Sequence, residues 1–363
     1  MGCCEATNVE LEGIVPPEGY ESGHDFNLTF DRRDALKGLL GIAGVIAVSS
    51  GSPKAFAQTP TKLTLAFCGQ LLCVVPYEVT RARGHFADQG LDVELVYTRG
   101  GNAAMQALVG GSVDYAGTSF DVALQAFSKG AKIRRFASTG RLPLFALAVA
   151  PKNKDSITSI KALEGTTVGI SGLGNADHAL MLYLLTHAGV DPGSVSFAAL
   201  GTNLFEAVKL GQVDAAMVQE PALSLIVEAG GRELFNAMDI ADANAKLGGA
   251  YEFMGVAVRA EERDRRLGEM KKLAAALKEG LADTRTIPPE EIIAALPSAL
   301  LAGGNVEQLK QIIPRYRESL YPETVTIDRS AAERVMMAHQ AAEILQPGAV
   351  DLGVLLDTAV LGG

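Results

Sequence analysis

One six-residue pattern occurs twice in the chain and restricts the folds open to it. Gly111-Ser112-Val113-Asp114-Tyr115-Ala116 returns one hundred residues later as Gly211-Gln212-Val213-Asp214-Ala215-Ala216. Each copy follows a helical pattern and opens a strand pattern, and similar loops at residues 99–102 and 200–203 precede the two helices. Glycine is common after helices because it tolerates the left-handed conformation. That preference does not explain a matching order of elements, so the repeat predicts two lobes built on the same plan.

The sequence around the repeat alternates strand and helix patterns, which indicates an α/β fold. In the first half we expect strands at residues 63–67, 93–97, 115–117, 133–137 and 145–150 and helices at 75–86, 103–109 and 122–128. In the second half we expect strands at 168–170, 195–198 and 215–218, with helices between them. From Glu261 onward the pattern is helical, at 265–282, 290–296, 306–319 and 331–345. Asp328 is the expected cap of the last helix.

Residues 1–57 have the pattern of a leader rather than of a folded segment. Residues 1–30 contain no Lys or Arg and include Pro16-Pro17, which is typical of an unstructured extension. Arg32-Arg33 and Lys37 then lead into eleven uncharged residues at 38–48, followed by Ala55-Phe56-Ala57. Eleven residues are too few to cross hydrocarbon, which takes about 20. The pattern resembles a twin-arginine export signal cleaved near Ala57, with Asp31 and Ala35 departing from the usual residues.

Charge and cysteine content exclude several classes of protein. The net charge of −10 repels nucleic acid and anionic lipid, so we expect no nucleic-acid partner. The five His show no metal-ligand spacing, and we expect no metal and no other cofactor. After export, Cys68 and Cys73 would remain in an oxidising compartment. A disulfide between them and two buried thiols are both open from the sequence.

Polar loops follow the expected strands of both halves, where open α/β sheets bind their ligands. Glycine in these loops lets a ligand approach the backbone, and the N–H groups at helix N-termini favour an anionic group. Each loop residue could alone be an ordinary helix cap, but six such loops together predict a ligand site. The expected ligand-binding residues are Gln70, Asn102, Thr118, Ser119, Ser171, Asn175, Asn203, Glu220 and Tyr251. Glu220 would favour a ligand that carries an amine.

Five motifs, in this order, resemble the solute-binding proteins of nitrate, sulfonate and taurine ABC importers, a family that shares its fold with thiamine-pyrimidine synthase. The motifs are GHFADQGL at residues 84–91, GGNAAMQAL at 100–108, GSVD at 111–114, IKALEG at 160–165 and Glu220-Pro221. The resemblance covers about residues 60–360. Each motif alone is loose, and the ordered set is specific for the family rather than for one ligand.

The resemblance implies a two-lobe periplasmic-binding-protein-like fold of type II, in which each lobe is a sheet flanked by helices. Residues 58–147 plus 240–363 would form the first lobe, with extra C-terminal helices on it, and residues 148–239 the second. A small solute, such as a sulfonate, taurine, nitrate or a pyrimidine-like compound, would drive closure of the lobes. The closed protein, expected to be a periplasmic monomer, would deliver the solute to an ABC permease and its ATPase. The chain itself lacks a phosphate-binding Gly-x-x-x-x-Gly-Lys-Ser/Thr motif.

Two other functions stay open from the sequence. Desulfinases that resemble this fold place a reactive Cys after the first strand, where Cys68 stands, so an enzyme with Cys68 as its nucleophile is one alternative. Against it, the sequence ties no His to Cys68, and we expect no catalytic activity. The other alternative is a ligand-sensing module that reports to a receptor rather than to a transporter.

Overall fold

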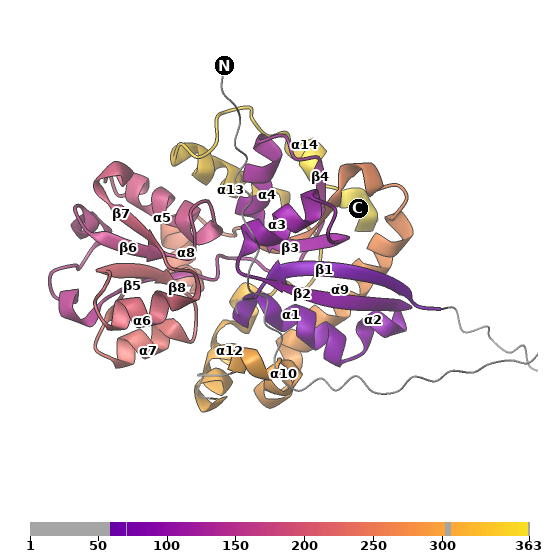
Figure 1. Cartoon of the computed structure of the whole chain (residues 1–363), viewed down its shortest axis with the longest axis horizontal. Coiled ribbons are helices and arrows are strands. Elements are labelled where there is room, and N and C mark those ends of the chain that lie inside the picture. Colours follow the sequence, from indigo (N-terminus) through magenta and orange to yellow (C-terminus); the bar gives the residue numbers. More distant parts are fainter. Residues whose placement is uncertain (1–58, 70, 302–305, 362–363) are drawn as a thin grey trace, which may run out of the picture. The chain divides into compact units, whose positions relative to one another are not determined.

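The computed structural model describes residues 59–69, 71–301 and 306–361. The expected leader at 1–57 and the expected ligand residue Gln70 lie outside the described residues. The described chain forms two five-stranded sheets, each flanked by helices, as Figure 1 shows. This arrangement confirms the expected α/β fold class.

The first sheet combines strands from the two ends of the described chain. Its strands, in order across the sheet, are β2 (Leu91–Thr98), β1 (Thr61–Cys68), β3 (Tyr115–Ser119), β10 (Met254–Arg259) and β4 (Ile133–Ser138). β1 is parallel to β2 and β3, whereas β10 is antiparallel to β3 and β4. β4 therefore reaches the rest of its sheet only through β10.

The second sheet repeats this plan with a continuous stretch of chain. Its strands, in order, are β7 (Ser196–Ala199), β6 (Thr167–Ile170), β8 (Ala215–Val218), β5 (Ala146–Val149) and β9 (Arg232–Asn236). β6 is parallel to β7 and β8, and β5 is antiparallel to β8 and β9. In both sheets the fourth strand, β10 or β5, runs antiparallel to its neighbours. In both cases this strand comes just after the chain has crossed from the other sheet.

The two aspartates of the repeated hexapeptide have matching structural roles. Asp114 accepts a hydrogen bond from the backbone N–H of Thr64 in β1 (2.8 Å), and Asp214 accepts one from the backbone N–H of Thr167 in β6 (2.9 Å). Each carboxylate thus extends the pairing of two neighbouring parallel strands, β1 with β3 in the first sheet and β6 with β8 in the second. The repeat that the sequence displays therefore encodes strand pairing.

Fourteen α-helices lie in the described part of the chain. Those that follow strands of the two sheets are α1 (Leu71–Ala82), α2 (His85–Asp88), α3 (Gly101–Val109), α4 (Phe120–Ser128), α5 (Ala176–His187), α6 (Leu204–Lys209), α7 (Ala222–Glu228) and α8 (Ile240–Leu247). The C-terminal helices are α9 (Leu267–Thr286), α10 (Pro289–Ala295), α11 (Ser298–Leu301), α12 (Val306–Leu320), α13 (Arg329–Ala341) and α14 (Leu352–Leu355). None of the helices in the described ranges is both long and apolar enough to cross a bilayer.

The helix boundaries differ from the sequence expectation at one informative place. The single helix expected at residues 75–86 is wrong, because α1 ends at Ala82 and α2 begins at His85. Gly84 separates them with a φ of 81°, a left-handed conformation that ends a helix. Asp328 caps α13 as expected, since its side chain accepts a hydrogen bond from Ala331 N–H.

The C-terminal helices pack mainly on the helices of the first sheet. α9 lies along α1 and α2, and Gly280 of α9 is so close to Thr80 of α1 that a Cβ atom there would overlap the Thr80 hydroxyl. α13 contacts both α4, which follows β3, and α5, which follows β6. The same helix therefore touches both halves of the structure.

Candidate ligand-binding site

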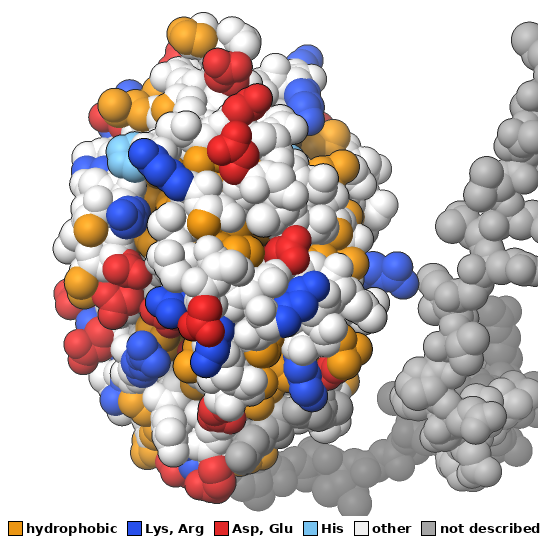
Figure 2. Space-filling view, turned by 90° about the vertical axis from the view of Figure 1, so that its left-hand side faces the viewer, with side chains coloured by type: hydrophobic (Ala, Val, Ile, Leu, Met, Phe, Trp, Pro, Cys, Tyr) orange, Lys and Arg blue, Asp and Glu red, His pale blue; other side chains and the backbone are white. Residues whose placement is uncertain are grey.

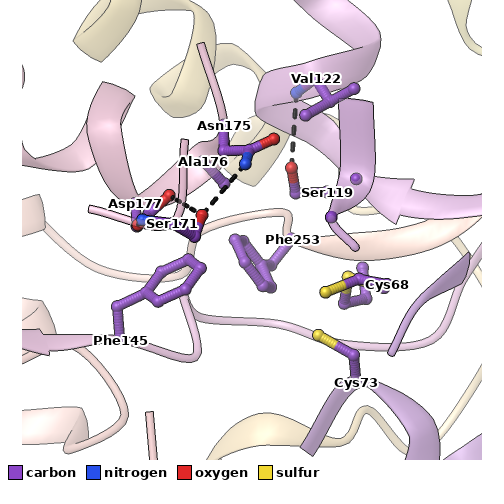
Figure 3. A pocket seen from close by; sticks show the side chains of 13 residues that line it. Cys68, Cys73, Ser119, Val122, Phe145, Ser171, Asn175, Ala176, Asp177 and Phe253 are labelled. Atoms are coloured by element: carbon purple, nitrogen blue, oxygen red, sulfur yellow. Dashed lines mark hydrogen bonds between the residues drawn. The ribbon is translucent and has the colours of Figure 1, made fainter. Parts of the chain in front are cut away.

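A small cavity lies where loops and helix ends from both sheets meet, and Figure 3 shows the side chains around it. Its volume is about 30 Å³. It is lined by Cys68, Cys73, Gly100, Gly101, Ser119, Val122, Phe145, Ser171, Asn175, Ala176, Asp177, Phe253 and Met254. A water molecule needs about 10–15 Å³ on this measure, so the cavity has room for about two.

Two helices from different sheets begin at this cavity. Gly100 precedes the nine-residue helix α3, and Asn175 precedes the twelve-residue helix α5; neither residue caps the helix that it precedes. Backbone N–H groups in the first turn of a helix have no partner within the helix, and the helix dipole favours negative charge there. In this structure oxygens of the site accept from these groups: Asn175 Oδ1 from Asn102 N–H of α3, and the Asp177 carboxylate from its own and the His178 N–H of α5.

A chain of polar side chains crosses from one half of the site to the other. Ser171 Oγ donates to Asp177 Oδ1 (2.7 Å), and Asn175 Nδ2 donates to Ser171 Oγ (3.0 Å). The backbone N–H of Asn102, in α3, donates to Asn175 Oδ1 (3.4 Å). The amide oxygen of Asn175 thus lies on the N-terminus of the opposite helix, at the position that suits an acceptor of a ligand.

Asp177 is a fully buried carboxylate in this cavity. Burial raises its pKa to about 6, because the charged form loses its hydration, while hydrogen bonds from Ser171 act in the opposite direction. At neutral pH the group is therefore mostly ionised. It places a negative charge beside the first turn of α5.

The remaining walls of the cavity are apolar or contain sulfur. The rings of Phe145 and Phe253 meet edge to face with centroids 5.8 Å apart. Figure 3 shows the Phe253 ring between the polar group of Ser171 and the two thiols of Cys68 and Cys73, with Phe145 below Ser171. The structure has both cysteines as buried thiols and no disulfide between them.

Three of the nine expected ligand residues line the cavity, namely Ser119, Ser171 and Asn175. Asn102 contacts Asn175 at its edge. Thr118 is buried next to Ser119, and its hydroxyl donates to the Ser119 carbonyl (3.3 Å). These five expectations therefore fall together in space, and their contact with a ligand stays a prediction.

The other described residues of that set lie away from the cavity lining. Asn203 is exposed before α6. Glu220 is buried, and its carboxylate accepts hydrogen bonds from the backbone N–H and the hydroxyl of Ser224 (3.1 and 3.0 Å). Tyr251 donates to Asp121 (3.0 Å) and borders a separate hollow of about 470 Å³ between α5, α8 and α13. Their predicted roles at a ligand gain no support from this geometry.

Among the lining residues that sequence reasoning did not expect, three matter most for the chemistry of the site. Asp177 could have been predicted from the sequence, because it lies two residues after Asn175, in the first turn of the same helix. Phe145 and Phe253 stand immediately before β5 and β10, where the chain arrives from the other sheet. No local sequence pattern predicts that these two rings meet, because they are far apart in the sequence and only the fold brings them together.

Metal binding by the usual ligands finds no support within residues 59–69, 71–301 and 306–361. In those ranges no group of three or more His, Cys, Asp or Glu side chains is placed to hold an ion. The described lining of the cavity also contains no Lys, Arg or His. Hydrogen bonding by backbone and side-chain donors is the chemistry that the site offers.

Solved structures with the same fold define the class of protein. A protein from Bordetella bronchiseptica RB50 has a TM-score of 0.75 and 24% identity, covering 84% of this chain and 96% of that chain. The periplasmic aliphatic sulphonate binding protein SsuA from Escherichia coli has a TM-score of 0.61 and 20% identity, with coverages of 81% and 96%. The periplasmic nitrate-binding protein NrtA from Synechocystis PCC 6803 has a TM-score of 0.64 and 15% identity, with coverages of 83% and 87%. The fold is that of the periplasmic binding proteins.

The sequence identifies the family more closely. The family model described as NMT1/THI5 like matches residues 74–291, which is more than half of the chain. The chain belongs to this family. No curated protein sequence matches it significantly.

Proposed function

We propose that this protein is the exported solute-binding component of an ABC importer, which captures a small solute and delivers it to a permease coupled to an ATPase. The observation that carries the proposal is the cavity at which two helices, one from each sheet, begin. The fold is shared with proteins named for sulfonate and nitrate binding, which supports the same role. The leader pattern at residues 1–57 supports a periplasmic location reached by the twin-arginine route, with cleavage near Ala57.

Closure of two lobes around the solute is part of the proposal, with residues 58–147 plus 240–363 as one lobe and 148–239 as the other. Contacts join the two sides beside the cavity, because Gln125 Nε2 donates to the Gly174 carbonyl (3.1 Å) and Asn102 Nδ2 to the Leu173 carbonyl (3.5 Å). A cavity with room for about two waters admits a solute only if these contacts open. A solute that bridges both sides then stabilises the closed arrangement.

The lining favours a small organic solute that carries an acceptor group and an amine. The helix N-termini of α3 and α5 suit a sulfonate, a carboxylate or a ring carbonyl. Asp177 places a negative charge in the same cavity, which suits an amine and disfavours a bare anion such as nitrate. Phe145 and Phe253 offer apolar contact to the body of the solute.

Mass spectrometry of small molecules that co-purify with the protein identifies candidate solutes, and thermal unfolding in their presence tests them. A true solute at 100 times its dissociation constant stabilises the protein by about 2.7 kcal/mol. Aminosulfonates, amino acids and aminopyrimidines form the test panel, with nitrate and simple alkylsulfonates as comparisons. If no compound of the panel and no co-purified molecule stabilises the protein, the proposal is wrong.

A pair of asparagine variants tests the place of binding. Asn175→Ala removes a side chain from the cavity lining and is expected to weaken the best solute by about tenfold or more, the effect of one lost hydrogen bond to a charged group. Asn203→Ala is the matched control, because Asn203 is exposed and outside the lining. Equal affinities of the two variants would contradict the assignment of the cavity.

The charge on the face shown in Figure 2 does not favour a second candidate function. Figure 2 shows acidic and basic side chains interspersed, with scattered hydrophobic ones, on the face of the molecule that carries the second sheet. A nucleic-acid site would call for a concentration of positive charge. Cys68, the nucleophile of the enzymatic alternative, forms a hydrogen bond with the Cys73 thiol, and no observation favours that alternative.

A further inference from the structure

Two thiols lie together at the wall of the cavity. Cys68 is the last residue of β1, and Cys73 lies in the first turn of α1. Figure 3 shows the two sulfur atoms turned toward one another. Both residues are buried, with 8% of Cys68 and 3% of Cys73 exposed. A strand end and the helix that follows it thus bring two cysteines together in a pair that solvent barely reaches.

The surroundings of the pair come from both halves of the structure. The Cys73 thiol forms hydrogen bonds with Cys68 and with the side chain of Gln219, which follows β8 of the second sheet. The bond with Cys68 and burial raise the pKa of Cys73 well above its usual range. The hydrogen bond with Gln219 acts in the opposite direction and lowers the pKa of Cys73. Because the thiolate is the reactive form, this hydrogen bond favours the reaction of Cys73.

We propose that Cys68 and Cys73 are a redox-active dithiol that closes to an intramolecular disulfide, and that the hydrogen bond from Gln219 to Cys73 favours the closing step. The two thiols are already within hydrogen-bond distance, so bond formation calls for no rearrangement of β1 or α1. The oxidant is an external disulfide, either of a small thiol or of a dithiol oxidase.

The reaction is a pair of thiol–disulfide exchanges. Cys68, the more exposed of the two, loses its proton to water, and its sulfur attacks one sulfur of the external disulfide. The external S–S bond breaks, and its other half leaves as a thiolate that takes up a proton. Cys73 then loses its proton and attacks the Cys68 sulfur of the mixed disulfide, which releases the second external thiol. The protein loses two protons and two electrons, and the external disulfide gains both.

Peptide mapping tests the disulfide directly. Residues 63–81 form a single tryptic peptide that contains both cysteines, because Lys62 and Arg81 are the flanking cleavage sites. The full chain is equilibrated with oxidised glutathione, remaining thiols are alkylated, and the peptide is weighed. We expect it to be lighter by the mass of two hydrogen atoms. Recovery of two alkylated cysteines, or of glutathione adducts alone, from the folded protein would overturn the proposal.

Single-cysteine variants separate the two steps. Cys68→Ser and Cys73→Ser each leave one thiol in the tryptic peptide 63–81, and we expect that peptide to gain the mass of one glutathione as a mixed disulfide. We expect the Cys73 thiol of the first variant to react more slowly than the Cys68 thiol of the second. The opposite order would contradict the first step as written.

A matched pair of glutamine variants tests the role of Gln219. Gln219→Leu keeps the size of the side chain but removes its amide, and we expect the disulfide to form at least about threefold more slowly, the effect of one lost hydrogen bond to the Cys73 thiolate. Gln212→Leu is the control, since Gln212 is exposed in the same half of the structure. If Gln219→Leu does not fold, as judged by circular dichroism, Gln219→Ala replaces it. Equal rates for the variant and the control would refute the role of Gln219. Neither a solute nor a permease enters these measurements, so their failure would leave the proposed transport function standing.

Discussion

A carboxylate that is both buried and hydrogen-bonded must balance two opposing effects, and Asp177 is the clearest case in this protein. Its oxygens accept hydrogen bonds from the backbone N–H and the hydroxyl of Ser171, which stabilise the charged form. Burial destabilises the charged form more, and the pKa rises to about 6. The residue therefore titrates in a range where the rest of the protein is expected to stay folded.

The variant Asp177→Asn tests the sign of this effect on stability. Because the pKa in the folded state lies above the unfolded value of 3.8, the contribution of Asp177 is fully present below about pH 4. It is lost as the pH rises through about 6. Asparagine does not titrate. The free energy of unfolding of the variant, measured with urea, should therefore rise relative to that of the wild type between about pH 4 and 7, by at most about 3 kcal/mol.

The control for this experiment is Asp155→Asn, an exposed aspartate of the same half of the structure. Its free energy of unfolding should follow that of the wild type at every pH. A constant difference between Asp177→Asn and the wild type across the same range would show that the raised pKa is absent.

At the residue scale, the sequence revealed the part of the site that depends on local chemistry. Ser119 and Asn175 were found because small polar residues stand before helices that follow strands. Glu220 had the same local signal, but its carboxylate turns back to Ser224 at the start of α7. The orientation of a buried side chain depends on the residues that surround it in the fold, and a local sequence pattern does not show which residues these are.

Close packing of two helices gives the clearest test at the scale of elements. Gly280 lies in the interior of α9, where glycine is intrinsically unfavourable. Its presence there is explained by Thr80 of α1, whose hydroxyl donates to the Pro76 carbonyl (2.6 Å) and occupies the space of a Cβ atom.

We expect Gly280→Ala to destabilise the protein by about 1–3 kcal/mol, because the new methyl group forces α9 away from α1. Gly268→Ala, in the same helix, is the control. A Cβ atom at Gly268 meets no atom within 4 Å, so this substitution should raise stability by about 0.5–1 kcal/mol through helix propensity. Chemical denaturation of both variants provides the comparison, and a stabilising Gly280→Ala would refute the packing argument.

The strands β1 to β8 were expected at nearly the observed positions, and they include β4 and β5, whose partners run antiparallel to them. β9 and β10 were not expected. Both pair with strands that are far away in the sequence, β9 with β5 and β10 with β3 and β4. The prediction of one helix at residues 75–86 was wrong because Gly84 adopts a left-handed conformation, which the helical pattern around it does not reveal.

The two sheets differ in how the chain supplies them. All five strands of the second sheet come from residues 146–236, whereas the first sheet takes β10 from residues 254–259. Without β10, both β3 and β4 would have an unpaired edge within the described part of the chain. Unpaired edges promote aggregation.

A pair of fragments tests this difference. We expect residues 142–239 to fold alone, with a cooperative thermal transition by circular dichroism and dispersed amide resonances. Residues 59–140 should aggregate or remain unfolded, because the strand between β3 and β4 is missing. A cooperative transition of the second fragment would contradict this account of the topology.

The insertion of β10 between β3 and β4 also orders events in time. More than one hundred residues separate β4 from β10, and a ribosome takes roughly 6–20 seconds to add them. During that interval β4 has no partner strand, whereas all five strands of the second sheet leave the exit tunnel and can pair with one another. The half of the protein that is translated first is thus the half completed last, and the nascent chain carries an unfinished sheet until the ribosome has passed Arg259.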